Sequence, residues 1–260
     1  MKKPVSSGMP EVMYHWRVSS VRKMLAMQGK AKGPLNVDDL TALGHLDQYH
    51  YLGKQTCYEI VEALQLDDRR HVLDIGSGVG GTSRVIAEAS GCRVTAVELQ
   101  EPLNELAEQL TQRVGLEDKI DYVSGSFMDY QTDTGFDHFV SLLVFLHIPD
   151  RNLVLRHCYR LLKPGGTFFI EDLVERKPFS EEEKHTLLTK VSAPSVSNKE
   201  AYTEDLQQAG FTDLHITDMS DTWRDWCYQR YHDFVAEEDF NRRFFGDEIY
   251  QQRSSFYHTI

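Results

Sequence analysis

Residues 71–81 constrain the fold of this chain more than any other stretch of its sequence. The apolar run 71–75 contains one acid, Asp74, and is followed by four glycines among residues 76–81. Residues 82–89 then show a pattern typical of a helix. Glycine is needed where the backbone takes a positive φ or where a ligand approaches closely, and a helix start offers free N–H groups. We therefore predict a buried strand, a tight turn and a helix, with a nucleotide-type cofactor at the carboxyl edge of a parallel sheet.

Two acids indicate which cofactor this turn would bind. The spacing Gly76-x-Gly78-x-x-Gly81 also fits the dinucleotide-binding pattern, which is weak when it stands alone. A diphosphate needs positive potential, whereas the Asp74 carboxylate ahead of the turn suits a positively charged ligand. S-adenosylmethionine carries a sulfonium and an ammonium and no phosphate. Glu98 ends the next apolar run, 94–97, at a spacing suited to accept both ribose hydroxyls. These acids favour S-adenosylmethionine over a nicotinamide dinucleotide.

Four short motifs resemble those of class I S-adenosylmethionine-dependent methyltransferases. They lie at 73–80, 97–98, 125–127 and 161–166, within a resemblance that runs from about residue 43 to about residue 219. Inside that class, the chain is similar to the sarcosine/dimethylglycine and phosphoethanolamine N-methyltransferases. The resemblance implies S-adenosyl-L-methionine as cofactor, S-adenosyl-L-homocysteine as product, and a Rossmann-like α/β fold. In that fold, helices cover both faces of a seven-stranded, mostly parallel sheet.

The expected elements follow from the apolar patterns together with this resemblance. Strands are expected at 71–75, 94–97, 119–123, 136–141, 167–172, 211–217 and, antiparallel at the sheet edge, 254–260. Helices are expected at 11–28, 54–64, 82–89, 101–114, 151–162 and 199–209, and the aromatic residues from 220 onward recur at helical spacing. We expect residues 1–65 to form an N-terminal helical cap and 66–260 the methyltransferase domain. Residues 174–199 are expected to be a substrate-side insertion that acts as a lid.

The candidate cofactor-binding residues lie in these motifs, directly after them, or in the segment 47–53. Glu98 is expected at the ribose, while Leu99 and Phe127 would cover the two faces of the adenine. Ser126 stands where the family often has an acid that binds the adenine amine. The full candidate set is Asp74, Gly76, Ser77, Gly78, Gly80, Thr82, Glu98, Leu99, Gln100, Ser126, Phe127, Ser141 and Gln48.

The candidate catalytic residues are His147, Tyr49 and His50. The fourth strand ends before His147, and ligands in open parallel sheets bind beyond the carboxyl ends of strands. Imidazole titrates near neutrality, so His147 could take a proton from an amine or hydroxyl acceptor. Similar N-methyltransferases have this histidine together with an acid at the position of Leu143. Each of the three candidates also has a structural interpretation, as a capping, packing or hydrogen-bonded core residue.

Composition narrows the class of protein. A net charge of -12 argues against general nucleic-acid binding, and 41% hydrophobic residues are typical of a soluble globular protein. The four cysteines form no C-x-x-C pair, so we expect reduced thiols and neither a metal site nor a disulfide framework. No signal peptide or membrane span is evident. We expect a cytoplasmic protein, monomeric or homodimeric, that acts on a small molecule and neither on nucleic acid nor at a membrane.

Several functions remain open at this stage. The leading hypothesis is methylation of an amine nitrogen. O-, S- or C-methylation of a hydrophobic natural product is the alternative, which the apolar run 142–146 would suit. A cofactor-binding partner protein without turnover is a further alternative, and a nicotinamide oxidoreductase is opposed by Asp74.

Overall fold

A five-stranded parallel sheet forms the centre of the molecule. The computed structural model describes residues 14–194 and 196–260, so the start of the helix predicted at 11–28 lies outside the described residues. The strand order is β3-β2-β1-β4-β5, and every neighbouring pair is parallel. The chain reverses its direction of progress across the sheet between β1 and β4, which places a crevice at their carboxyl ends. The strands are β1 His71–Ile75, β2 Arg93–Glu98, β3 Ile120–Ser124, β4 Phe136–Leu142 and β5 Leu162–Glu171.

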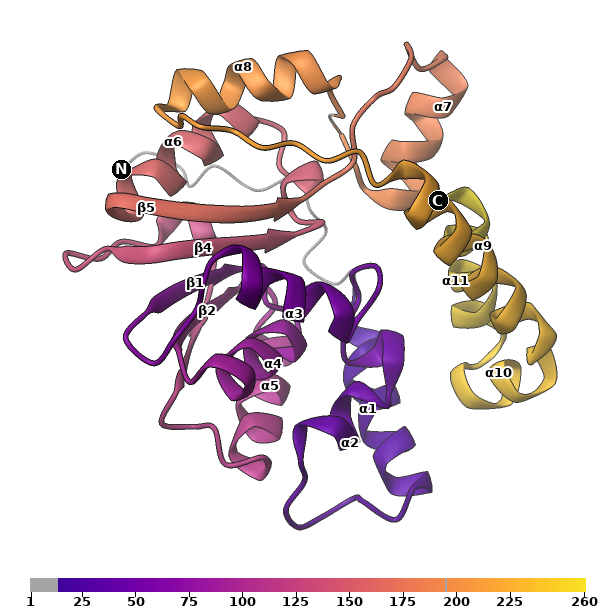
Figure 1. The fold of residues 1–260 in the computed structure, drawn as a ribbon. Coiled ribbons are helices and arrows are strands. Elements are labelled where there is room, and N and C mark those ends of the chain that lie inside the picture. Colours follow the sequence, from indigo (N-terminus) through magenta and orange to yellow (C-terminus); the bar gives the residue numbers. More distant parts are fainter. Residues whose placement is uncertain (1–13, 195) are drawn as a thin grey trace, which may run out of the picture.

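Helices cover both faces of this sheet (Figure 1). Alternate residues of β1 supply the two cores: Leu73 and Ile75 pack toward α6 and α8, whereas Val72 packs toward α3 and α4. A strand buried on both faces reads as a continuous apolar run, as the sequence of β1 does. The helices concerned are α3 Lys54–Ala63, α4 Gly81–Ser90, α5 Glu101–Arg113, α6 Arg151–Leu161 and α8 Lys199–Ala209. Their positions confirm the helices expected at these places.

The expected sheet of seven strands is wrong in its last two members. Residues 211–217 form no strand: Phe211 is buried, but Asp213 takes a φ of +54° and most of the following residues are exposed. Residues 254–260 lie mainly in a helix, α11 Asp247–Thr259. Tyr250, Arg253 and Tyr257 are its buried residues, and their spacing of three and four favours a helix over a strand. Within the described residues, β5 therefore has a partner on one side only.

The remaining helices gather beyond the carboxyl ends of the strands. In Figure 1 the arrowheads of β4 and β5 point toward the side of the molecule where α7, α9 and α11 lie. On the α5 side, Val21 and Leu25 of α1 pack against Leu103 and Leu106 in one apolar cluster. These helices are α1 His15–Met27, α2 Val37–Thr41, α7 Glu181–Thr186, α9 Ser220–Ala236 and α10 Glu238–Phe245. Helix α9 confirms the helical spacing of the aromatic residues after position 220.

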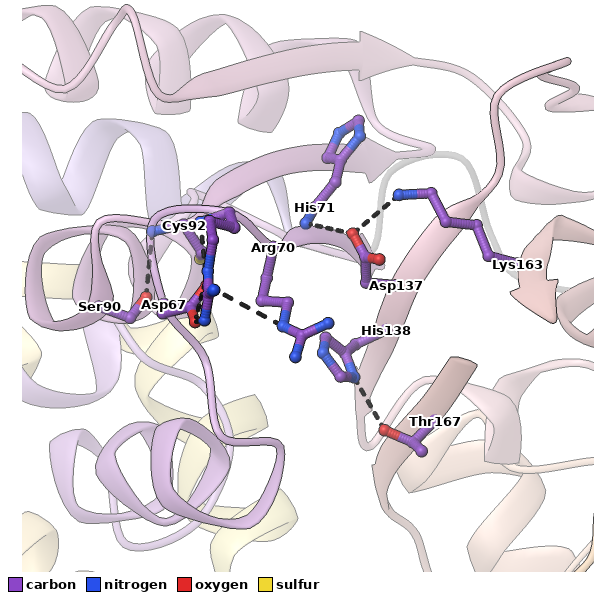
Figure 2. Close-up of polar contacts among 10 residues, drawn as sticks. Asp67, Arg70, His71, Ser90, Cys92, Asp137, His138, Lys163 and Thr167 are labelled. Atoms are coloured by element: carbon purple, nitrogen blue, oxygen red, sulfur yellow. Dashed lines mark hydrogen bonds and ion pairs between the residues drawn. The ribbon is translucent and has the colours of Figure 1, made fainter. Parts of the chain in front are cut away.

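Polar contacts tie the strands together at their amino ends (Figure 2). The Asp137 carboxylate accepts hydrogen bonds from the His71 backbone N–H and from Lys163 Nζ, both at 2.9 Å. His138 Nδ1 lies 2.8 Å from Thr167 Oγ1. These contacts join β1, β4 and β5 at the edge opposite the crevice, so we interpret them as structural.

The cysteines and the lengths of the helices were two features considered in the sequence. The four cysteines are buried and unpaired, as expected for reduced thiols. Among the described residues, no helix combines the length and the apolar character that crossing a bilayer requires.

Candidate functional site

A cavity opens at the carboxyl ends of β1, β2 and β4. Together with the open solvent at its mouth, it takes in about 1000 Å³ of space between protein atoms. Its walls come from the glycine turn, helix α1, residues 47–51, the segment after β4, and helix α11. The lining residues are Tyr14, Arg17, Asp47, Gln48, Tyr49, His50, Tyr51, Asp74, Gly76, Ser77, Gly78, Gly81, Thr82, Glu98, Gln100, Leu103, Leu142, Leu143, Val144, Leu146, His147, Leu173, Val191 and Phe256.

The glycine turn packs too closely for side chains at key positions. Gly80, directly before α4, takes a φ of +78°, and a Cβ there would lie 2.2 Å from the Tyr122 hydroxyl oxygen. The Gly76 N–H donates to the Val97 carbonyl at 2.8 Å, which joins the turn to β2. The Gly78 N–H donates to Glu98 Oε2 at 2.9 Å. The turn therefore brings the backbone and the acid at the end of β2 to one side of the cavity.

Asp74 and Glu98 place two carboxylates in the cavity wall. Ser83 Oγ donates to Asp74 Oδ2 at 2.5 Å, and burial raises the pKa of Asp74 to about 6. Glu98 accepts from the Gln100 N–H at 2.8 Å in addition to the Gly78 N–H, and burial raises its pKa as well. Each carboxylate oxygen has two lone pairs, so both groups can accept further hydrogen bonds from a ligand.

Hydrogen-bond donors without partners lie in the same cavity. Within the described residues, Arg17 Nε, Gln48 Nε2 and Ser77 Oγ are buried and have no hydrogen-bond partner. Buried polar atoms are normally paired, so these three atoms are available to donate hydrogen bonds to a polar ligand. Burial lowers the pKa of Arg17, but an arginine starts high enough to keep its charge at neutral pH.

The acceptors and donors together fit a zwitterionic nucleoside. Asp74 suits an ammonium group, Glu98 suits paired ribose hydroxyls, and Arg17 with Gln48 suits a carboxylate. S-adenosylmethionine presents all three groups. A dinucleotide would instead place its diphosphate near two carboxylates, which is electrostatically unfavourable.

A buried ion pair holds residues 47–51 against the glycine turn. Arg84 Nη2 of α4 lies 2.5 Å from Asp47 Oδ1, and the two side chains are 0% and 1% exposed. Arg17 Nη2 donates to the carbonyl groups of Leu46 and Asp47 at 3.0 and 3.3 Å. Both arginines therefore tie the segment before α3 to the wall of the cavity.

His147 belongs to a mostly apolar part of the cavity lining, supplied by residues 142–147. It ends the short 3-10 helix η3 Phe145–His147 that follows β4. Its Nδ1 lies 3.0 Å from the Ser192 carbonyl oxygen, and burial lowers its pKa. Leu143 lines the same part of the cavity and takes a φ of +58°.

The other two catalytic candidates differ from His147 in their contacts. The ring nitrogens of His50 lie 3.0 Å from the Tyr51 carbonyl oxygen and 3.9 Å from Cys57 Sγ. Burial lowers the pKa of His50 to about 4, so this histidine is neutral at pH 7. The Tyr49 ring packs against Tyr14 with ring centroids 5.1 Å apart, and burial raises its pKa. Both side chains line the cavity, and their catalytic role stays a prediction.

Five of the cofactor-binding candidates do not line the cavity. Phe127 is buried in the core, with its ring 4.8 Å from that of His157, and does not face the cavity as an adenine cover would. Ser126 caps the 3-10 helix η2 Phe127–Asp129 by accepting from the Met128 N–H. The five are Gly80, Leu99, Ser126, Phe127 and Ser141. Their contacts with a cofactor stay predictions.

Sequence reasoning missed several cavity residues. Arg17 is the most informative, because it shares the buried face of α1 with Val21 and Leu25. An arginine at helical spacing within an apolar stripe was a detectable signal. Val191 and Phe256 gave no such signal, since only the long-range packing of the segments that carry them brings them to the cavity. Glu171, the last residue of β5, and Asp172, which follows it, do not line the cavity.

Comparison with known proteins identifies the domain. Residues 73–170 match a family model described as a methyltransferase domain. The chain contains a methyltransferase domain. A sarcosine/dimethylglycine N-methyltransferase of Halorhodospira halochloris is 34% identical over 155 residues, which cover 59% of this chain and 56% of that protein. A sterol 24-C-methyltransferase of Eremothecium gossypii is 35% identical over 111 residues, covering 42% and 30%. The predicted methyltransferase resemblance is confirmed.

A solved structure extends the likeness beyond this methyltransferase domain. Phosphoethanolamine N-methyltransferase 2 of Haemonchus contortus, in complex with phosphomonomethylethanolamine and S-adenosylhomocysteine, aligns with a TM-score of 0.75. The sequences are 19% identical, and the alignment covers 99% of this chain and 56% of that chain. At this identity the likeness concerns the fold. In each of these three comparisons, the alignment spans less than two thirds of the other protein's length.

Proposed function

We propose that this chain transfers a methyl group from S-adenosylmethionine to the nitrogen of a small-molecule amine. The observation that carries the proposal is the set of acceptors and unpartnered donors in one cavity beside the glycine turn. Asp74 and Glu98 supply the acceptors, while Arg17 and Gln48 supply the donors. The relatives named above as N-methyltransferases support the choice of nitrogen.

In this proposal, the residues beside the glycine turn bind the cofactor. Asp74 would bind the ammonium, Glu98 the ribose hydroxyls, and Arg17 with Gln48 the carboxylate. The bound cofactor would supply an electrophilic methyl group on its sulfonium. The protein's task is then alignment and exclusion of water, because holding the reactants near attack distance can contribute roughly 7–11 kcal/mol.

His147 would act as the base for the acceptor. A protonated amine has no lone pair for attack, so its proton must leave before the new bond forms. Burial lowers the pKa of His147, which keeps the imidazole neutral near pH 7 with a free lone pair, although the same shift makes it a weaker base. The neighbouring wall is apolar, with Leu143, Leu146 and Phe256 facing the same cavity. This wall would exclude water from the acceptor.

O-, S- or C-methylation of a hydrophobic acceptor is the second candidate. The apolar wall beside His147 favours it, and one relative is named as a sterol C-methyltransferase. The lining residues within 142–147, with Val191 and Phe256, include no carboxylate, so these described residues offer a cationic amine no anionic partner. The two candidates differ in the acceptor and share the cofactor site.

Incubation with S-adenosylmethionine and a panel of acceptors tests the proposal. The panel contains amines, amino acids and hydrophobic alcohols, and formation of S-adenosylhomocysteine is measured together with the mass of each product. Methylated amine is the expected result. Methylation of the alcohols alone would select the second candidate, and cofactor binding with no product from any acceptor would favour a partner protein without turnover. A matched His147→Gln variant, expected to bind cofactor but to turn over slowly, controls for background methylation.

The N-terminal helices and the segment 174–199 have proposed roles of their own. We propose that the described part of the N-terminal region, residues 14–65, covers the amino-acid end of the cofactor, since its Arg17 and Gln48 line the cavity. The segment 174–199 contributes Val191 to the cavity lining, which is consistent with a lid. Limited proteolysis with and without S-adenosylhomocysteine tests both roles, and protection of both regions by the ligand is expected.

A further inference from the structure

The hydrogen bond between His147 and Ser192 fixes where the imidazole carries its proton. A carbonyl oxygen can only accept a hydrogen bond, so Nδ1 of His147 must be the donor at 3.0 Å. Burial keeps the ring neutral, and a neutral ring protonated at Nδ1 has its lone pair at Nε2. Within the described residues, Nε2 has no hydrogen-bond partner. The ring is therefore set to accept a proton at Nε2.

The backbone of Ser192 has an unusual conformation. A π-helical turn, Leu187–Val191, precedes it, and Ser192 itself takes φ 57° and ψ 36°. Left-handed backbone is unfavourable for a non-glycine residue, so the surrounding packing must hold it. The Ala193 N–H donates to the Leu187 carbonyl at 3.0 Å and closes this turn. Isolated π-helical turns are frequent at functional sites.

Apolar packing seats this turn over the cavity. Val191 and Ala193 are buried against Leu146, one residue before His147, and the partly buried Phe256 of α11 joins the same cluster. The position of the Ser192 carbonyl thus depends on how residues 187–193 dock.

The two ends of the segment are joined to each other. The Glu175 N–H donates to the Ser197 carbonyl at 2.8 Å, and Glu175 pairs with Asn198 in a short parallel bridge. These two contacts fix the base of the segment that contains α7 and the turn 187–193. Docking of that segment brings the Ser192 carbonyl to the histidine.

We infer that the Ser192 backbone carbonyl is the positioning group for His147, and that docking of residues 187–193 completes the base. The inference rests on the proposed function, because His147 is useful as a base only if an acceptor must lose a proton. In that step the N–H bond of a protonated amine breaks, the proton forms a bond to Nε2, and the nitrogen keeps the electron pair. Nδ1 keeps its hydrogen, and the Ser192 carbonyl then accepts a stronger, charge-assisted hydrogen bond from the imidazolium.

Nuclear magnetic resonance of protein labelled with ¹⁵N-histidine tests the inference directly. The chain has 11 histidines, and the His147→Gln variant assigns the signal that disappears. Long-range ¹⁵N–¹H couplings distinguish a ring protonated at Nδ1 from one protonated at Nε2. We expect His147 of the intact protein to be protonated at Nδ1 near neutral pH. Protonation at Nε2 would overturn the inference.

Variants at Ser192 separate positioning from general stability. Ser192→Val should lower the Nδ1-protonated population, because a β-branched residue disfavours left-handed backbone. Ser192→Gly accepts that backbone without strain and should restore the wild-type tautomer. The matched control is Asp213→Val, since Asp213 has a similar φ of 54° but does not line the cavity. An unchanged tautomer in a folded Ser192→Val protein would overturn the inference, and so would the same change in Asp213→Val.

Kinetics provide the second readout. Ser192→Val should lower kcat about 10- to 100-fold while KM for S-adenosylmethionine stays within about twofold, and Ser192→Gly should recover most of kcat. If Ser192→Val does not fold, Leu187→Ala, which loosens the same cluster, takes its place. Methyl transfer with an Nε2-protonated His147 would reject the inference alone. An Nδ1-protonated His147 without methyl transfer to any acceptor would reject the proposed function alone.

Discussion

Replacing Asp74 by asparagine tests the electrostatic basis of the cofactor site. The pKa of Asp74 is raised to about 6 by burial, so the empty cavity begins to bind a proton there as the pH falls through this value. A ligand ammonium needs the carboxylate form, so binding must displace that proton at low pH. With one such group, affinity scales as 1/(1 + 10^(pKa − pH)), which makes binding about tenfold weaker at about pH 5 than at about pH 7.5. This factor corresponds to about 1.4 kcal/mol.

The asparagine variant separates Asp74 from the other titrating groups. Its affinity for S-adenosylhomocysteine near pH 7.5 should fall about 10- to 100-fold, because a hydrogen bond to a charged group contributes roughly 1.5–3 kcal/mol. Its remaining pH dependence should be shallower than that of the wild type. The pKa of Glu98 is also raised, but Glu98 is present in both proteins, so the difference between them isolates Asp74.

Isothermal titration calorimetry with S-adenosylhomocysteine measures both effects. The ligand keeps its ammonium and its carboxylate charged across this pH range. The reasoning is refuted if wild-type affinity is the same at about pH 5 and pH 7.5, or if the variant follows the wild-type curve in parallel. Circular dichroism at each pH confirms that the protein stays folded.

Three further predictions concern the groups around this site. Glu171 has its pKa raised to about 8 by burial, so folded protein keeps a proton that unfolded protein loses above about pH 4.5. Its contribution to stability is complete below about pH 4.5 and is lost as the pH rises to about 8. In urea unfolding, the free energy of unfolding of the wild type should therefore fall with pH in that window by up to about 1.4 kcal/mol per pH unit more than that of Glu171→Gln. Equal pH slopes for the two proteins would contradict this prediction. Asp47→Ala leaves the Arg84 cation buried without its partner and should lower the free energy of unfolding by about 3–5 kcal/mol; a loss below about 1 kcal/mol would mean that water reaches this pair. His147→Gln should lower kcat about 10²- to 10⁴-fold with nearly unchanged calorimetric affinity for S-adenosylhomocysteine, and the opposite pattern would move His147 from the base to the cofactor site.

The central sheet and the glycine turn could be predicted because their signals are local. Each of the five strands is a short apolar run, and Asp74 and Glu98 are recognised by their distance from the glycines. Both acids line the cavity, where they lie beside the turn as the parallel strands require. The order of the parallel strands alone brings the residues at their carboxyl ends together. Placing Asp74 and Glu98 therefore required little knowledge of contacts between distant segments.

The outer walls of the site could not be predicted in the same way. Which helices cover the carboxyl edge depends on packing between segments far apart in sequence, as the Phe256 and Val191 contributions illustrate. The last expected strand failed for a different reason. The spacing of Tyr250, Arg253 and Tyr257 favours a helix, whereas the resemblance to seven-stranded enzymes favours a strand. The local pattern is the one that agrees with the structure.

The crystal structure of the complex with S-adenosylhomocysteine tests the central claim most directly. The account predicts the ligand ammonium within hydrogen-bond distance of Asp74, both ribose hydroxyls on Glu98, and the ligand carboxylate on Arg17 or Gln48. It also predicts that soaking with a nicotinamide dinucleotide leaves the cavity without that ligand. A dinucleotide seated over the glycine turn, or S-adenosylhomocysteine bound away from both carboxylates, would contradict the account.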